Sequence, residues 1–113
     1  MNANREIQTL SQTLKLADGP QDWGIMNSDP SRIEEFIRFR ETAPLTSAQQ
    51  FAMGELVFAS MNDALIEGIA VDDLERFLGL ELHGLLWHVR YWSSLGGEEF
   101  PIAALLRRLA IPA

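Results

Sequence analysis

The chain of 113 residues contains no cysteine, so disulfide bonds and thiolate metal sites are excluded. The lack of cysteine is typical of a reducing compartment. No stretch approaches the roughly 20 apolar residues that a membrane span requires. The N-terminal residues also lack the basic start and continuous apolar stretch of a signal peptide. We therefore expect a cytoplasmic protein that does not enter a membrane.

Basic residues are scarce. Nine Lys and Arg stand against sixteen Asp and Glu, which gives a formal net charge of -7. Nucleic-acid binding depends on neutralising phosphates with Lys and Arg, so this charge argues against a nucleic-acid partner. An acidic surface either keeps a protein soluble or attracts a basic partner. The composition leaves both readings open.

The alternating apolar pattern of a strand is missing as well, and apolar residues recur at helical spacing instead. We predict an N-terminal helix over about 3–17, an apolar loop over 18–29 anchored by Trp23, and a helical body over 30–113. Since domains commonly contain about 100 to 150 residues, one domain is expected over 1–113. The predicted fold is an all-α, single-domain bundle of four to five helices.

Several helix boundaries carry capping signals. Asp29 followed by Pro30 predicts a helix start, because Asp can accept the free N–H groups and Pro lacks one at the first position. Thr46 and Gln49 form a capping-box pattern at the start of another helix. Gly68 is the predicted end of that helix.

The C-terminal third predicts two further helices. An apolar stripe over 73–94 predicts one helix, opened by a capping pattern at Asp72 and Glu75. Glycines within the stripe predict a kink or a split near 79–82. Pro101 is the predicted start of the last helix.

The helix predicted over about 46–67 is apolar nearly all round, which is typical of the buried centre of a bundle. It nevertheless carries two buried polar candidates, Glu55 and Asn62, which lie seven residues apart and so share one side. Its predicted apolar flank includes Phe51 and Ile66. The predicted solvent face follows Gln49, Ser60, Asp63 and Glu67.

A buried carboxylate is costly unless it is paired. We therefore predict that Glu55 pairs with an arginine of a neighbouring helix, namely Arg38, Arg40 or Arg90, and that Asn62 bonds to loop backbone. Two alternatives remain open for Glu55. It would be a proton carrier or ligand-binding group in a cleft, or it would belong to a partner interface.

The two histidines, His83 and His88, point about 140° apart on a helix and so cannot hold one metal ion together. Glu81 shares a face with His88, which we interpret as a surface or interface contact. The chain contains no nucleophile elbow, phosphate-binding glycine loop or paired-carboxylate motif. We expect no catalytic residues, no metal site, no cofactor and no enzymatic activity.

Two surfaces are candidates for a protein partner. One is acidic, since only Arg76 interrupts the acids between Asn62 and Glu81, although helix capping explains part of this cluster. The other is an apolar face with Phe77, Leu80, Trp87 and Tyr91, which either another helix covers or a partner binds. The predicted partner-binding residues are Asp63, Glu67, Asp72, Asp73, Trp87 and Tyr91.

Short segments along the chain resemble those of small, acidic, all-α bacterial immunity proteins from polymorphic or contact-dependent toxin systems. The segments are the Asp22-Trp23-Gly24 loop, Asp29-Pro30 with Phe36-Ile37, Glu55-Leu56 to Asn62-Asp63-Ala64-Leu65, and Tyr91-Trp92-Ser93 before Phe100-Pro101. The resemblance implies a single-domain inhibitor that binds one toxin directly and has no activity of its own. It implies no particular site residues.

Three other functions remain as alternatives. A secretion chaperone or adaptor is also small and acidic, but such proteins commonly include strands. A homodimer would pair two central helices across a two-fold axis. A small enzyme would need Glu55 to line an open cavity.

Overall fold

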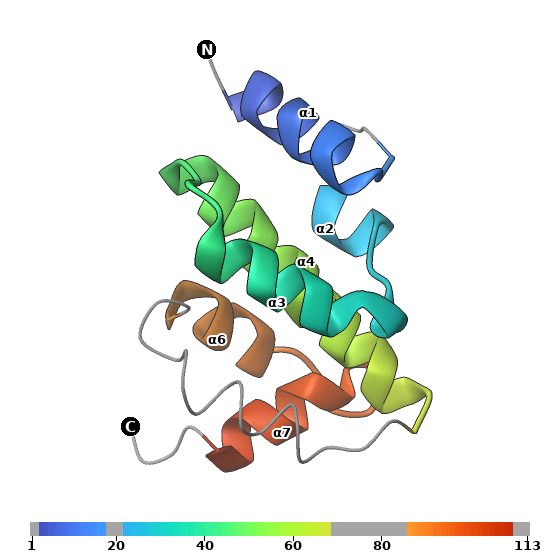
Figure 1. Ribbon diagram of the computed structural model, residues 1–113. Helices are drawn as coiled ribbons and strands as arrows, with labels where there is room; N and C mark the ends of the chain where they lie inside the picture. Colours follow the sequence, from blue (N-terminus) through green and yellow to red (C-terminus); the bar gives the residue numbers. More distant parts are fainter. Residues whose placement is uncertain (1–2, 18–21, 69–85, 110–113) are drawn as a thin grey trace. The chain divides into compact units, whose positions relative to one another are not determined.

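The computed structural model describes residues 3–17, 22–68 and 86–109. All regular secondary structure in these ranges is helical, which confirms the all-α class (Figure 1). None of the described helices is long and apolar enough to cross a membrane. The elements are α1 (Ala3–Leu14), α2 (Trp23–Met26), the 3-10 turn η1 (Pro30–Arg32), α3 (Ile33–Thr42), α4 (Ser47–Ile66), α6 (Leu86–Ser93) and α7 (Pro101–Leu109).

The chain forms two compact units, Met1–Ser60 and Met61–Ala113, and the division falls inside α4. Unit 1 therefore holds α1, α2, α3 and most of α4. Unit 2 holds the last residues of α4 together with α6 and α7. A single domain over the whole chain stays a prediction.

Helix α4 is buried around nearly its whole circumference, as predicted. Between residues 52 and 62 every side chain is buried except Glu55, which is half-buried. Met53, Leu56 and Phe58 are fully buried. Large apolar side chains reach water only at the two ends of the helix, where Phe51 is 44% and Ile66 is 61% exposed.

The predicted solvent face of α4 is wrong at Gln49 and Ser60, which are both buried. Each of these polar side chains finds a backbone partner within unit 1. Gln49 Nε2 donates to Glu6 O at 3.1 Å, and Ser60 Oγ accepts from Asp29 N at 3.0 Å. A buried polar group is tolerated when it is hydrogen-bonded in this way. Asp63 is half-buried, and only Glu67 of the predicted face is exposed.

The capping signals place the starts of α3 and α4 correctly. Asp29 accepts from Ser31 N at 2.9 Å and opens η1, which continues into α3. Thr46 N donates to Gln49 Oε1 at 3.0 Å, and Gln49 N donates to Thr46 Oγ1 at 3.2 Å. This reciprocal pair is the predicted capping box.

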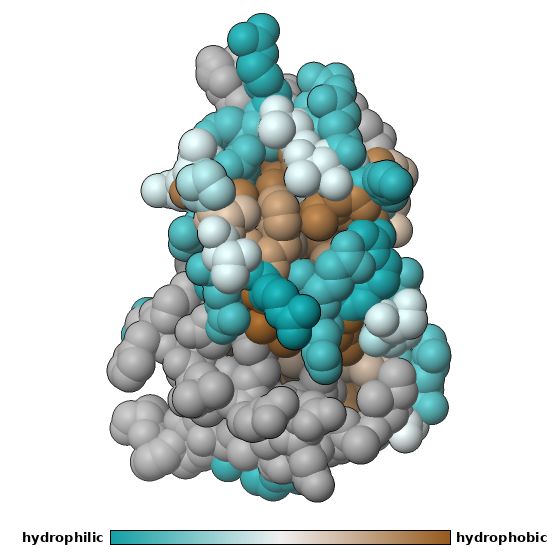
Figure 2. Space-filling model, in the orientation of Figure 1, coloured by the Kyte–Doolittle hydropathy of each residue, from teal (hydrophilic) through white to brown (hydrophobic). Residues whose placement is uncertain are grey.

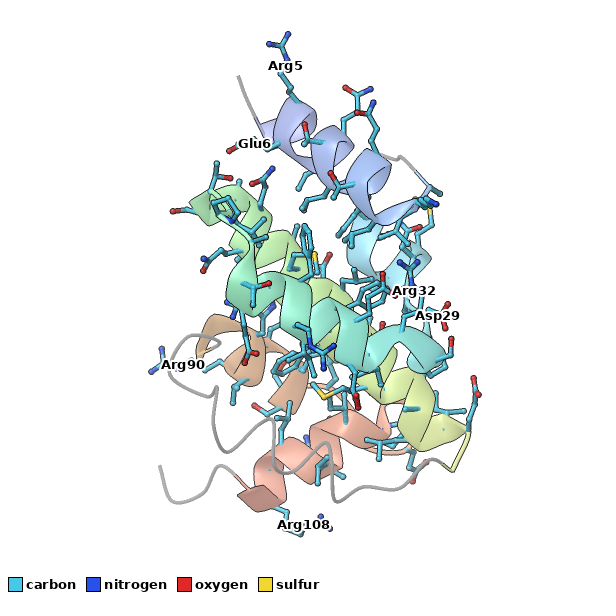
Figure 3. All side chains as sticks on the ribbon, viewed as in Figure 1. Arg5, Glu6, Asp29, Arg32, Arg90 and Arg108 are labelled. Carbon is cyan, nitrogen blue, oxygen red and sulfur yellow. The ribbon has the colours of Figure 1, made fainter. Side chains whose placement is uncertain are left out.

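Helix α1 ends three residues earlier than predicted. Lys15 adopts a left-handed conformation with φ 59°, and Leu16 N donates to Ser11 O at 2.8 Å. This is the Schellman helix end, which more often uses glycine at the left-handed position. Arg32 Nη2 donates to Leu14 O at 2.9 Å and so also satisfies the end of α1. Figure 3 shows Arg32 beside Asp29 in this region of unit 1.

In unit 2, α6 and α7 pack together across a short connection. Trp92 of α6 meets Phe100 edge-on, with 6.1 Å between ring centroids. Arg107 Nη1 donates to Ser93 O at 2.7 Å and to Leu95 O at 2.8 Å, which satisfies the end of α6. The start of the predicted 73–94 helix, its capping residues Asp72 and Glu75 and its kink near 79–82 lie outside the described residues.

Candidate functional site

The predicted apolar loop contains a single helical turn, α2, which docks on the rest of unit 1. Trp23 anchors it, as predicted: the side chain is 5% exposed, and its Nε1 donates to the buried Ser11 Oγ at 2.7 Å. Asn27 then closes the turn. Its Nδ2 donates to Ala17 O and its Oδ1 accepts from Ala17 N, both at 2.9 Å.

Gly24 brings α2 into direct contact with the backbone of α4. A Cβ atom built on Gly24 would lie 2.8 Å from Leu56 N and 2.8 Å from Glu55 Cγ. Real Cβ atoms do not approach other atoms so closely. Position 24 therefore admits only glycine at this spacing.

The backbone N–H of Gly24, the second residue of α2, faces the carboxylate of Glu55. The residue before α2, Asp22, makes no side-chain cap of its own. The Glu55 carboxylate, which belongs to α4, therefore offers the start of α2 an acceptor that α2 itself lacks. The burial of Glu55 raises its pKa, the Gly24 N–H lowers it, and the negative charge of Asp22 raises it again.

The predicted arginine partner of Glu55 is wrong within unit 1. Arg40 Nε instead donates to Gln50 O at 3.3 Å, and Arg38 forms no ion pair among the described residues. Arg90 belongs to unit 2. The carboxylate faces the N–H groups of a helix N-terminus and not a cation. The sequence alone could not show this.

Asn62 has the same role in unit 2. Its Oδ1 accepts from Ile102 N, the second residue of α7, at 3.0 Å. The preceding residues offer α7 no side-chain cap, because Phe100 has no polar atom in its side chain and Pro101 has no N–H. Asn62 bonds to backbone as predicted, but the backbone belongs to the first turn of α7 and not to a loop. Between residues 52 and 62 of α4, Glu55 and Asn62 therefore both face the starts of other helices, whereas the third polar side chain there, Ser60, accepts from Asp29 N.

Replacing Glu55 by Gln tests this capping role. Because the folded-state pKa of Glu55 is raised above its ordinary value of 4.5, folding favours the protonated form. Its contribution to stability is complete below pH 4.5 and is lost as the pH rises through the folded-state pKa. Gln keeps the acceptor oxygen without the charge. We expect Glu55→Gln to gain up to about 1 kcal/mol at pH 7, a small effect because half-exposed charges remain partly solvated.

Urea unfolding of both proteins between pH 4 and pH 8 provides the measurement. The stability difference should shrink toward acidic pH. Glu55→Leu, which removes the acceptor, serves as the contrasting variant and should be destabilised. A large loss of stability in Glu55→Gln at pH 7 would instead indicate an ion pair at this position.

The predicted partner-binding residues do not gather into one described surface. Asp63 and Glu67 lie at the C-terminal end of α4, whereas Tyr91 lies on α6, and these two elements are on opposite sides of unit 2 (Figure 1). Tyr91 is 45% exposed, so the apolar face is only partly covered at this residue. Asp72, Asp73, Phe77 and Leu80 lie outside the described residues, as does the side chain of Trp87.

His88 is buried, with 3% of its surface exposed, and its predicted surface or interface contact with Glu81 stays a prediction. Val89 and Trp92, which belong to the predicted apolar stripe, are buried as well. Glu81 and His83 lie outside the described residues. Within the described ranges no three His, Asp or Glu side chains come together in an arrangement that would hold a metal ion.

Exposed apolar side chains form the part of the surface that the sequence pattern missed. Ile25 and Met26 of α2 are about half exposed, with values of 48% and 50%. Ile66 was predicted to lie on the apolar flank of α4, but at 61% it is the most exposed large hydrophobic side chain described. The sequence contained one signal for this exposure: Ile66 directly precedes Glu67 and the helix-ending Gly68. Figure 2 shows a further hydrophobic area on unit 1, between the hydrophilic side chains of α1 and α3.

The chain matches no protein-family model, and comparisons with curated proteins and with solved structures found no match.

Proposed function

We propose that this chain is a non-enzymatic protein-binding module and, more specifically, an immunity protein that neutralises a cognate basic toxin by direct binding. The observation that supports this most is the C-terminal end of α4. There the exposed Ile66 lies between the acidic residues Asp63 and Glu67. We call this surface, residues 63–68, the α4 end.

The composition of the α4 end suits a protein interface better than a catalytic site. An apolar side chain exposed among charges supplies buried area on binding, while the surrounding acids supply selectivity. The chain as a whole carries a net charge of -7. Opposite charge on a partner would raise the association rate, which matters for an inhibitor that must reach its toxin quickly.

The polar residues of α4 give no support to an enzyme. The Glu55 carboxylate faces the Gly24 N–H, and Asn62 accepts a hydrogen bond from the Ile102 N–H. Both side chains are therefore accounted for by helix capping. A binding module needs no further chemistry from them.

The test begins with the neighbouring genes, where we expect a large toxin-like gene immediately upstream, whose toxin domain is then co-expressed with this chain. A metabolic operon at that place would contradict the proposal. We expect that domain to arrest growth alone, that this chain restores growth, and that the two purified proteins form a one-to-one complex by light scattering. An unrelated acidic helical protein expressed at the same level is the control. Restoration by the control, or continued arrest despite a folded chain, contradicts the proposal. A stable dimer of the chain alone would favour the homodimer alternative.

A further inference from the structure

Helix α2 is a single turn whose two sides differ in burial. Trp23 and Gly24 are buried against the rest of unit 1, where Trp23 also donates its hydrogen bond to Ser11. Ile25 and Met26, the next two residues, are 48% and 50% exposed. Because Trp23 and Gly24 already dock the turn, the fold does not explain why the outward side chains are apolar.

Asp22 lies on the same outward side of the turn. It precedes Ile25 by three residues and Met26 by four, which is the spacing of neighbours on a helix surface. Met26 N donates to Asp22 O at 2.7 Å, so the helical turn includes Asp22. The Asp22 side chain is exposed and makes no hydrogen bond to the start of α2. A carboxylate is therefore next to the two exposed apolar side chains.

Glu55 of α4 adds a second carboxylate at the edge of this side. A Cβ atom on Gly24 would lie 2.8 Å from Glu55 Cγ, so Glu55 contacts the turn directly. Burial raises the pKa of Glu55 most, and the negative charge of Asp22 raises it as well, because the two carboxylates repel each other. A cation placed near both would relieve this repulsion. We call the surface formed by Asp22, Ile25, Met26 and Glu55 the α2 face.

We propose that the α2 face is a docking surface for a basic protein segment in which an apolar residue stands beside an arginine or lysine. The apolar residue of the partner covers Ile25 and Met26, and the cationic group lies near Asp22 and Glu55. Methionine suits such a contact, because its flexible side chain adapts to irregular shapes. The α2 face belongs to unit 1, whereas the α4 end belongs to unit 2.

The two carboxylates decide which segment fits. Any segment that covers Ile25 and Met26 also removes water from Asp22 and Glu55, which is costly unless these charges are paired. An uncharged apolar segment supplies no cation for them, and an acidic segment adds repulsion. A second copy of the chain would bring a net charge of -7 to the same place. A segment that is both basic and apolar meets both requirements.

The inference deepens the proposed function and rests on it only for the identity of the partner, which would be the basic toxin. The chemistry of the α2 face does not depend on that identity. Short peptides can therefore test the surface without the toxin.

Asp22→Asn removes one charge of the α2 face with little effect on the fold. Asp22 has a left-handed backbone with φ 54°, a conformation that asparagine also tolerates. No cap is lost, because the Asp22 side chain makes none. The Tm should change by less than about 2 °C. Binding of a basic apolar segment should weaken about threefold.

The double variant Ile25→Thr, Met26→Gln removes the apolar part of the α2 face. It should weaken binding about tenfold. The matched control for charge is Glu41→Gln. Glu41 is exposed and lies in the last turn of α3, outside the α2 face. Glu41→Gln changes the net charge by the same amount as Asp22→Asn, so it reports the effect of overall charge alone.

The direct experiment is an NMR titration of the ¹⁵N-labelled full chain with three tetrapeptides: acetyl-LRLR-amide, acetyl-LELE-amide and acetyl-GRGR-amide. We expect only the first, which is both basic and apolar, to shift the amide signals of residues 22–27 and 55. The response should weaken in Asp22→Asn and in the double variant, and it should stay the same in Glu41→Gln. Spectra without peptide show whether each variant is folded, and Ile25→Thr alone replaces the double variant if the latter does not fold.

Several results would overturn the inference. An equal response to acetyl-GRGR-amide would indicate charge attraction alone, and an equal response to acetyl-LELE-amide would indicate a purely apolar contact. Shifts spread over acidic residues generally would place the peptide elsewhere. An unaltered response in Asp22→Asn and in the double variant would show that the α2 face is not the docking surface.

The two proposals fail in different ways. If the chain neutralises a toxin and the variants of the α2 face neutralise it equally well, the proposed function stands and the docking surface is wrong. If the basic apolar peptide binds the α2 face but no neighbouring toxin is neutralised, the surface stands and the immunity function is wrong.

Discussion

Gly24→Ala is expected to destabilise the protein by about 1 to 3 kcal/mol, although Ala is the better helix former. The new methyl group would lie 2.8 Å from both Leu56 N and Glu55 Cγ. The backbone of α4 has little room to move, because Met53, Leu56 and Phe58 around it are fully buried. Helix α2 must therefore shift outward, which moves the Gly24 N–H away from Glu55 and weakens the Trp23 hydrogen bond to Ser11.

Chemical denaturation followed by tryptophan fluorescence measures this effect and reports on Trp23 as well. Gly96→Ala is the control, because Gly96 is exposed and a Cβ atom there has nothing within 4 Å. The control should change stability by no more than about 0.5 kcal/mol. Equal stabilities for the two variants would show that α2 does not rest on α4.

Asn62→Ala is expected to cost about 1 to 3 kcal/mol, because it leaves a buried N–H without its acceptor. The Asn62 side chain is buried, and Ile102 N has no alternative partner from Phe100 or Pro101 side chains. Unlike an ordinary surface cap, this one joins α4 to the start of α7. We therefore expect unit 2 to lose order around α7, beyond the fraying of one turn.

Thermal unfolding gives the magnitude, and amide hydrogen exchange at residues 102–106 gives the location. Asn62→Asp keeps an acceptor oxygen near a helix N-terminus and should retain more stability than Asn62→Ala. Ser93→Ala is the control, at a half-buried position in the same unit. This change keeps the backbone carbonyl of residue 93, which accepts from Arg107. Uniform loss of protection across the chain in Asn62→Ala would contradict a local capping role.

The sequence predicted those features that depend on neighbouring residues. Asp29, the Thr46 and Gln49 pair, Gly68 and Pro101 all mark helix boundaries where expected. Such signals work because the capping atoms and the capped N–H groups are only two to three residues apart. The burial of α4 was also predictable, since an all-round apolar helix has no face suited to water.

The sequence did not reveal which polar side chains would be buried. Gln49 and Ser60 look like surface residues, but they are buried because backbone groups 43 and 31 residues away in sequence bond to them. Glu55 looked like half of an ion pair because it is a carboxylate among apolar residues. The group that faces it is the backbone N–H of Gly24, and the sequence does not reveal this because every residue type except proline carries a backbone N–H. One weak signal in the sequence indicated the close contact at Gly24: a glycine directly after a tryptophan inside an apolar loop.

Besides its buried side chains, the N-terminal segment is held by hydrogen bonds to its main chain. Gln49 donates to Glu6 O, and Arg32 donates to Leu14 O. The Asn27 amide hydrogen-bonds to both the N–H and the C=O of Ala17. These hydrogen bonds use backbone atoms of residues 6, 14 and 17, so they do not depend on which side chains these residues carry. Positions on the outer side of this segment can therefore tolerate sequence drift, or carry a fused tag or label, while the segment stays attached.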